Sequence, residues 1–266
     1  MTVEIVTDTS QEKAILETCI KSKAKQGESL QILEAGCGNK WQLSLTGIDY
    51  TLSGIDIDAD AVALRQKKYN DLDDVLIGDL RTAELPADQY DVIYTAYVLE
   101  HVDNVNKVLE NFYRWLKPGG VIIIKVPDRD SVYGFVARNT PHWTHVLYYR
   151  WIKGNKNAGK PGYLPYPTVY DKALARSSIS AYCARHGLKV RATYGKNNYL
   201  RNKSLRDHAI RVFVQLMNLF SFGKLAWHYN DLIYIIEKPV LRAAANGPDD
   251  NPKRWQATGS IEKTSA

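Results

Sequence analysis

Short apolar segments alternate with longer segments of helical spacing through the first half of the chain. The apolar segments, each typical of a buried strand, are residues 30–34, 52–56, 75–77, 90–94 and 121–126. The other segments carry apolar side chains at the i, i+3 and i+4 spacing of an amphipathic helix, and they are residues 10–25, 61–69 and 105–116. This alternation predicts an α/β protein built on a parallel sheet.

The second half of the chain interrupts this alternation twice. Residues 128–171 lack regular periodicity and are rich in aromatic and basic residues. A connection of this length usually carries function, and we interpret it as a substrate lid. Residues 204–227 form a second insertion, in which a helix over 208–227 has many large apolar residues and little polar face. Strands at 188–194 and 232–238 then complete a seven-stranded, mostly parallel sheet whose last strand is antiparallel.

We expect one domain over residues 10–240, because 266 residues with 45% apolar content can bury a full core. The first nine residues carry no pattern and predict a loose terminus. Asp58 and Asp103 precede helical segments and are suited to capping them. Beyond residue 240 the composition turns to Ala, Asn, Asp, Pro and Thr, which predicts a disordered tail over 241–266.

The net charge of +6 hides a strong asymmetry. Residues 1–124 hold 12 Lys and Arg against 20 Asp and Glu, whereas residues 125–225 hold 18 against 4. A basic segment beside an acidic half predicts an anionic substrate or an anionic surface. A solvated basic face with no partner is the alternative.

Neither a membrane span nor a secretion signal is expected, because the chain has no run of 18 or more uncharged apolar residues and no charged-then-apolar leader. Its three cysteines, Cys19, Cys37 and Cys183, are isolated in the sequence and fit reduced thiols. We therefore expect a cytoplasmic protein, with peripheral contact to a membrane left open.

A glycine turn follows the first strand. Gly36 and Gly38 allow positive φ and let a ligand approach the main chain closely. Asp56 ends the next strand about 20 positions later, where a carboxylate can accept hydrogen bonds from ribose hydroxyls. The dinucleotide fingerprint would need a third glycine at the position of Trp41. A nicotinamide or flavin dehydrogenase is therefore disfavoured.

The motifs that follow, in order, resemble those of class I S-adenosylmethionine-dependent methyltransferases. They are E-x-G-x-G at 34–38, G-I-D at 54–56, G-D at 78–79, Y-D-V-I at 90–93, L-E-H-V at 99–102 and L-K-P-G-G at 116–120. The resemblance covers residues 30–127, with weaker similarity near 240. It implies a doubly wound fold with the cofactor half at 10–127, and S-adenosyl-L-methionine as the cofactor.

The resemblance also implies which residues bind the cofactor. They lie at or just after the ends of four strands: Glu34, Gly36, Cys37, Gly38, Asp56, Ile57, Asp79, Leu80, Ala96 and Tyr97. The backbone of Gly36, Cys37 and Gly38 would pass against the methionine part, and Glu34 would support either the turn or the cofactor amine. Asp56 would bind the ribose. Asp79 with Leu80 would contact adenine, and Ala96 with Tyr97 would lie near the methyl donor.

If the acceptor is an alcohol, a histidine is the usual general base at neutral pH. His101, His142 and His145 are the catalytic candidates. His101 belongs to L-E-H-V, which many members of the family share, so a structural role is favoured for it. His142 and His145 have the i, i+3 spacing that would let both point into one pocket. Ubiquinone-pathway and small-RNA O-methyltransferases hold a divalent ion around L-E-H-V, but Tyr97 replaces the acidic ligand here, so we expect no metal.

The leading hypothesis is methyl transfer, at oxygen, to a small-molecule, sugar or lipid-linked acceptor that carries anionic groups. An RNA methyltransferase is a second reading, favoured by the basic segment with its interleaved Tyr and Trp. It is disfavoured because no RNA-binding module is recognisable and Ala96-Tyr97-Val98-Leu99 replaces the amino-methylation motif. A cofactor-binding scaffold at a membrane surface is a non-enzymatic alternative. The apolar helix at 208–227 would pack within the protein, in a homodimer or on a lipid.

Overall fold

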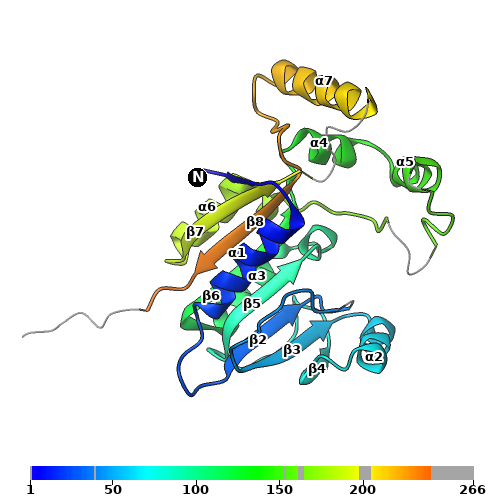
Figure 1. Cartoon of the computed structure of the whole chain (residues 1–266). Coiled ribbons are helices and arrows are strands. Elements are labelled where there is room, and N and C mark those ends of the chain that lie inside the picture. Colours follow the sequence, from blue (N-terminus) through cyan, green and yellow to red (C-terminus); the bar gives the residue numbers. More distant parts are fainter. Residues whose placement is uncertain (1, 39, 153, 161–164, 198–204, 241–266) are drawn as a thin grey trace, which may run out of the picture.

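A mixed sheet with helices on both faces runs through the protein, seen here in a computed structural model (Figure 1). The structure describes residues 2–38, 40–152, 154–160, 165–197 and 205–240. Over these residues the sheet has eight strands: β1 (Glu4–Val6), β2 (Leu30–Ala35), β3 (Tyr50–Asp56), β4 (Asp74–Ile77), β5 (Tyr90–Ala96), β6 (Leu116–Pro127), β7 (Lys189–Lys196) and β8 (Asp231–Glu237). Their order is β1-β7-β8-β6-β5-β2-β3-β4. The predicted tail at 241–266 lies outside the described residues.

The predicted doubly wound sheet is confirmed, with one strand more than expected. Strands β2 to β6 pair in parallel, and the last strand, β8, runs antiparallel to β6 and β7. The prediction of a loose terminus was wrong, because β1 pairs in parallel with β7 and buries Val6. Three residues are too few to show an alternating pattern, so this edge strand could not be predicted from the sequence.

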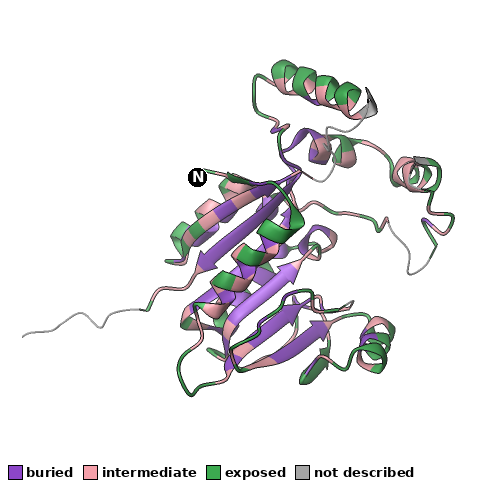
Figure 2. Ribbon diagram, viewed as in Figure 1, coloured by how far each residue is buried: buried purple, intermediate pink, exposed green. Residues whose placement is uncertain are grey.

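Two hydrophobic layers, one on each face of the sheet, form the core. Helices α1 (Thr9–Lys21) and α2 (Ala59–Lys68) cover one face, and α3 (Val105–Trp115) and α6 (Arg176–Arg185) cover the other. The apolar spacing of α3 places Val105, Phe112 and Trp115 at zero exposure. Figure 2 shows the strands largely buried, while the outer side of α1 is exposed.

The start of α3 differs from the prediction. Asp58 caps α2 as expected, accepting a hydrogen bond of 3.0 Å from the Ala61 N–H. Asp103, however, does not cap α3 and is exposed beside Arg81. The Val105 N–H instead donates to Asp171, 66 residues away, at 3.1 Å. The cap therefore fastens the segment at 171 to the helix that follows β5.

A lobe lies beyond the carboxyl ends of the parallel strands (Figure 1). We use this name for residues 128–171 and 205–230. It contains α4 (Val132–Asn139), α5 (His142–Leu147), a π-helical turn at Tyr148–Ile152 and α7 (Leu205–Phe220). The helix predicted over 208–227 thus ends seven residues early, because Phe222 and Gly223 adopt positive φ and the Gly223 N–H closes the helix on the Asn218 carbonyl.

Candidate active site

The strand order changes direction between β5 and β2. From β2 the chain builds outward through β3 and β4, whereas β5 and β6 lie on the other side. In open α/β sheets a crevice forms outside the carboxyl ends of the strands at such a point, and ligands bind there. The predicted cofactor residues follow β2, β3, β4 and β5, so the topology brings them to this edge.

The glycine turn after β2 is held against β3. Gly36 has a φ of +83°, and a Cβ at this position would clash with Val98. The N–H groups of Gly36 and Cys37 both donate to the Ile55 carbonyl, at 2.8 and 3.2 Å. The Cys37 side chain is fully buried in the core, and burial raises its pKa to about 12. Cys37 therefore offers the crevice its backbone and not its thiol.

The Asp56 carboxylate stands at the centre of the crevice with acceptor capacity to spare. One oxygen accepts from the Gly38 N–H at 2.8 Å and the other from the Asp58 N–H at 2.9 Å. A carboxylate has about four lone-pair sites, so ribose hydroxyls could still donate to it. Ile57, next in the chain, has 71% of its surface exposed and offers an apolar face beside the carboxylate. These residues fit a nucleoside cofactor.

A buried arginine that the sequence analysis missed ties this crevice together. Arg65 on α2 is 1% exposed and donates to Glu34 at 2.7 Å, to Asp71 at 2.8 Å and to the Cys37 carbonyl. Asp71 in turn accepts from the Trp41 N–H at 3.1 Å. Burial raises the pKa of Glu34 to about 7, although Arg65 opposes this rise. Glu34 thus supports the glycine turn through Arg65.

The two residues expected at adenine are already engaged. The Asp79 carboxylate pairs with the Arg81 guanidinium, with Nε 3.0 Å from both oxygens, and these bonds hold the pKa of Asp79 below its ordinary value. The Leu80 side chain lies in the core, and its carbonyl accepts from Asn111 at 2.8 Å. Contact with adenine through these residues remains a prediction.

The segment after β5 carries a strained residue. Tyr97 follows Ala96 and has a φ of +58°, a conformation that costs about 1–3 kcal/mol for a non-glycine residue. Its hydroxyl donates to Asp231 at 2.5 Å, and the Lys125 ammonium lies 4.8 Å from its ring centre. Burial raises the pKa of Asp231 to about 6. These contacts fix Tyr97 at the carboxyl end of the sheet.

Glu100 and His101 bind residues 167–170 of the lobe through hydrogen bonds. The Glu100 carbonyl accepts from the N–H groups of Val169 and Tyr170, at 2.8 and 3.2 Å. His101 Nδ1 lies 2.7 Å from the Pro167 carbonyl oxygen, which matches the structural role that the sequence favoured. The Glu100 side chain is 3% exposed, and burial raises its pKa to about 8. These bonds anchor residues 167–170 over the end of β5.

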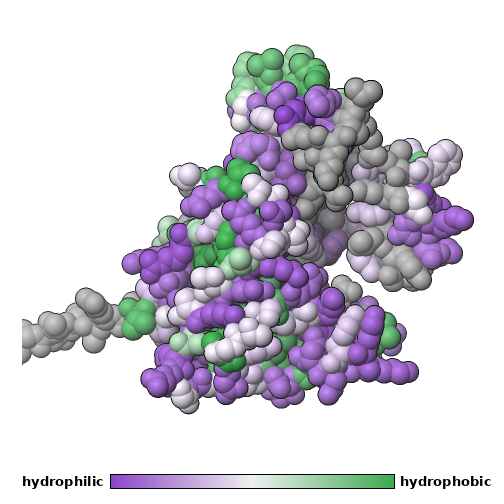
Figure 3. Space-filling model, viewed as in Figure 1, coloured by the Kyte–Doolittle hydropathy of each residue, from purple (hydrophilic) through white to green (hydrophobic). Residues whose placement is uncertain are grey.

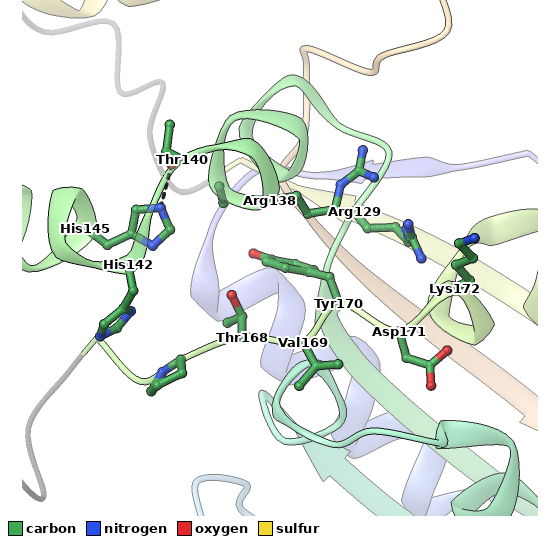
Figure 4. Close-up of a pocket in the computed structure, with 12 residues that line it drawn as sticks. Arg129, Arg138, Thr140, His142, His145, Thr168, Val169, Tyr170, Asp171 and Lys172 are labelled. Carbon is green, nitrogen blue, oxygen red and sulfur yellow. Dashed lines mark hydrogen bonds between the residues drawn. The ribbon is translucent and has the colours of Figure 1, made fainter.

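A cavity of about 440 Å³ opens between α4, α5 and residues 167–172. His142 and His145 both line it, with ring centres 6.1 Å apart, and His145 Nε2 lies 2.8 Å from the Thr140 hydroxyl oxygen (Figure 4). Burial, and then His142, lower the pKa of His145. In Figure 4 the Tyr170 ring stands between these histidines and a group of cationic side chains.

Three cations, Arg129, Arg138 and Lys172, form the other side of the cavity (Figure 4). Arg129 is only 9% exposed, and its Nε and Nη1 groups are buried without a hydrogen-bond partner among the described residues. The nearest paired carboxylate oxygen, on Asp130, is 3.8 Å from Nε. A buried guanidinium is stable only when its charge and donors are satisfied. The cavity is therefore suited to an anionic group. The basic composition of this segment was the only feature of the sequence that pointed to it.

No group of three or more His, Cys, Asp or Glu side chains in the described part of the chain is arranged to hold a metal ion. Cys19, Cys37 and Cys183 are free thiols. This edge of the sheet thus carries the glycine turn with the Asp56 carboxylate, and the lobe carries a cationic cavity lined by two imidazoles.

Comparison with known proteins agrees with this geometry. Residues 12–165, more than half of the chain, match the methyltransferase domain family. Ubiquinone biosynthesis O-methyltransferase of Rickettsia bellii is 29% identical over 147 residues, covering 48% of this chain and 60% of that protein. Sterol 4-C-methyltransferase of Caenorhabditis elegans is 27% identical over 122 residues, covering 42% and 36%. The chain thus matches less than two thirds of each relative.

The fold is shared with solved methyltransferase structures. A SAM-dependent methyltransferase from Methanosarcina mazei superposes with a TM-score of 0.52 at 14% identity, covering 84% of this chain and 97% of that one. Identity this low shows the fold alone, whereas the family match rests on the sequence itself. The chain therefore belongs to the methyltransferase domain family, and its fold is shared with S-adenosylmethionine-dependent methyltransferases of known structure.

Proposed function

We propose that the enzyme transfers a methyl group to an oxygen atom of an acceptor that carries an anionic group. The acceptor would be a small molecule, a sugar or a lipid-linked compound, held in the cavity between α4, α5 and residues 167–172. The observation that carries this proposal is Arg129, which lines the cavity and is buried with two N–H groups that have no hydrogen-bond partner among the described residues. A phosphate or carboxylate in the cavity would pair with this guanidinium through charge-assisted bonds.

Within one domain over residues 10–240, separate groups of residues would bind the cofactor and the acceptor. Gly36, Gly38 and Asp56 would hold the cofactor, which supplies an electrophilic methyl group when bound. The lobe would act as the lid, so that α5 brings its imidazoles to the acceptor hydroxyl. Alignment of two bound reactants can supply roughly 7 to 11 kcal/mol of the barrier. Exclusion of water by the lid strengthens every charge interaction inside.

His145 is the preferred general base of the two cavity histidines. Because its pKa is lowered, its ring is neutral at pH 7 and can accept a proton. The contact with Thr140 orients the ring. His142 lies beside it and would assist in positioning the acceptor. The O-methyltransferase activity in the name of the Rickettsia bellii relative favours oxygen as the methylated atom.

A paired-acceptor assay tests the proposal. Each acceptor is offered with and without its anionic group, for example a sugar phosphate and the free sugar, together with cofactor labelled with deuterium in the methyl group. We expect labelled O-methyl product only from the anionic member of a pair. Preference for the neutral member, or methylation of RNA instead, would overturn the proposal.

The substitution Arg138→Gln sharpens this test, because Arg138 lines the cavity and is exposed, so its loss should not unfold the protein. We expect KM for the anionic acceptor to rise about tenfold, which corresponds to about 1.4 kcal/mol, while cofactor affinity is unchanged. Arg185→Gln, at an exposed arginine on α6 away from the cavity, is the matched control. Equal KM values for the two variants would show that Arg138 does not bind the acceptor.

A further inference from the structure

The outer side of α7 is apolar and uncovered. Large apolar residues exposed by 46% to 92% recur there at helical spacing and continue past the end of the helix: Val212, Phe213, Leu216, Leu219, Phe220 and Phe222. We call these six residues the docking face. Val214 on the opposite side is 2% exposed, and α7 packs against α4. Figure 3 shows the hydrophobic atoms gathered on the side of α7 that faces away from the sheet.

A second apolar series lies in the same lobe. Trp143, Leu147 and Trp151, at i, i+4 and i+8 along α5 and the π-helical turn, are exposed by 62%, 41% and 81%. Monomeric proteins rarely leave large apolar patches open to water without a partner. Tryptophan is enriched where proteins meet the interface of a lipid bilayer. The composition of the exposed apolar surface is thus that of an interfacial element.

The exposed charge of the lobe has one sign. Among its described residues, every Lys, Arg, Asp or Glu that is exposed is a cation: Arg138, Arg150, Lys156, Lys160 and Lys224. The four acidic residues, Asp128, Asp130, Asp171 and Asp207, are buried or only partly exposed. A partner that meets both the docking face and these cations must therefore be apolar and anionic at once. A second copy of the lobe would bring like charges together, which disfavours a dimer through this face.

The chain's own C-terminal segment does not suit the docking face either. Residues 241–266 contain only three large apolar residues, Leu241, Trp255 and Ile261, among Ala, Asn, Asp, Pro and Thr. An apolar helix face with six large side chains would find few contacts in such a segment. An anionic lipid surface offers both features, because its acyl region accepts the apolar face and its headgroups attract Lys and Arg.

We propose that the docking face of α7 lies on an anionic lipid surface, with the exposed cations of the lobe outside the cavity, Arg150, Lys156, Lys160 and Lys224, at its headgroups. The 16-residue helix lies in the interface and does not cross it, since no helix in the described part of the chain is long and apolar enough to span a bilayer. The cationic cavity belongs to the same lobe, so docking would bring it to the membrane. This proposal does not depend on which compound accepts the methyl group.

Vesicle flotation of the full-length protein tests the proposal. The probes are phosphatidylcholine vesicles alone and the same vesicles with phosphatidylglycerol. We expect binding to the anionic vesicles, weaker binding when salt is raised, and at least a tenfold loss of partitioning in the triple variant Leu219→Ser, Phe220→Ser, Phe222→Ser. These side chains are exposed by 68%, 75% and 92%, so the variant should keep its fold and its cofactor affinity, which calorimetry checks.

The control is Ile5→Ser with Leu64→Ser, two residues exposed by 46% and 65% outside the lobe. We expect this variant to bind vesicles as the parent does. Absence of binding by the parent, or equal binding by the triple variant, would overturn the proposal. So would a parent that sediments as a dimer in solution and becomes monomeric in the triple variant, because the docking face would then be covered by a second copy.

Discussion

The surroundings of the glycine turn, which we predict to bind the cofactor, and the cavity of the lobe, which we propose for the acceptor, differ in how their buried charges are paired. In the crevice, Arg65 is buried and its guanidinium bonds to two carboxylates and a carbonyl. In the cavity, Arg129 is also buried, but two of its N–H groups have no hydrogen-bond partner among the described residues, and the nearest carboxylate, of Asp130, is 3.8 Å away. A site whose polar groups are already satisfied by protein partners is preorganised, which suits a single constant ligand. A site with unpaired donors is completed by its ligand, so specificity for the acceptor can reside there.

The largest expected effect comes from breaking the satisfied network. Arg65→Met leaves Glu34 and Asp71 without their partner, and Glu34 is buried. Removing one partner of a buried ion pair costs about 3–5 kcal/mol, so the free energy of unfolding should fall by that amount. Chemical denaturation measures it, with Lys67→Met at an exposed position on the same helix as the control. A loss equal to that of the control would mean that the network is dispensable.

The Arg65 network also shows which contacts could not be predicted from the sequence. Apolar periodicity predicts the strands and the helices α1, α2 and α3, because burial on a sheet follows local spacing. Arg65 follows buried Val62 at i+3 and so lies on the inward face of α2. That spacing was an available signal, but an arginine on a short amphipathic helix is normally read as a surface residue.

The lobe was less predictable for a different reason. Its cavity is made by two stretches, 129–145 and 167–172, that are brought together by long-range bonds such as Glu100 to Val169 and Val105 to Asp171. No periodic pattern encodes such bonds. The sequence therefore predicted an aromatic and basic insertion with paired histidines, but neither its short helices nor the buried Arg129.

The second-largest expected effect is a loss of turnover when a histidine of the cavity is removed. His145→Ala should lower kcat about 10²-fold if this ring is the general base, while cofactor affinity stays unchanged. Because the pKa of His145 is lowered, the parent should gain activity as pH rises through a value below 6.5 and then reach a plateau. The variant should lose this acidic limb. His208→Ala, at an exposed histidine outside the cavity, should keep both the rate and the limb. An unchanged rate in His145→Ala, and in His142→Ala as well, would make the two cavity histidines structural.

The smallest expected effect is a loss of cofactor affinity in a variant of Asp56. It distinguishes a ligand-binding role of this residue from a structural one. Asp56 accepts one backbone hydrogen bond on each oxygen, and we predict that ribose hydroxyls use its remaining acceptor sites. Asp56→Ala should therefore weaken S-adenosyl-L-methionine binding by more than tenfold, or about 1.4 kcal/mol, because the hydroxyls lose their hydrogen-bond acceptor. Isothermal calorimetry measures this change, and Asp60→Ala, on the exposed start of α2, is the control. The variant also frees the Gly38 N–H, so denaturation must be followed in parallel. If affinity falls while stability is unchanged, Asp56 is a ligand. If affinity and stability fall together, the Asp56 carboxylate mainly stabilises the glycine turn. The shape of the crevice then depends on hydrogen bonds within the protein, as the buried charge of Arg65 does.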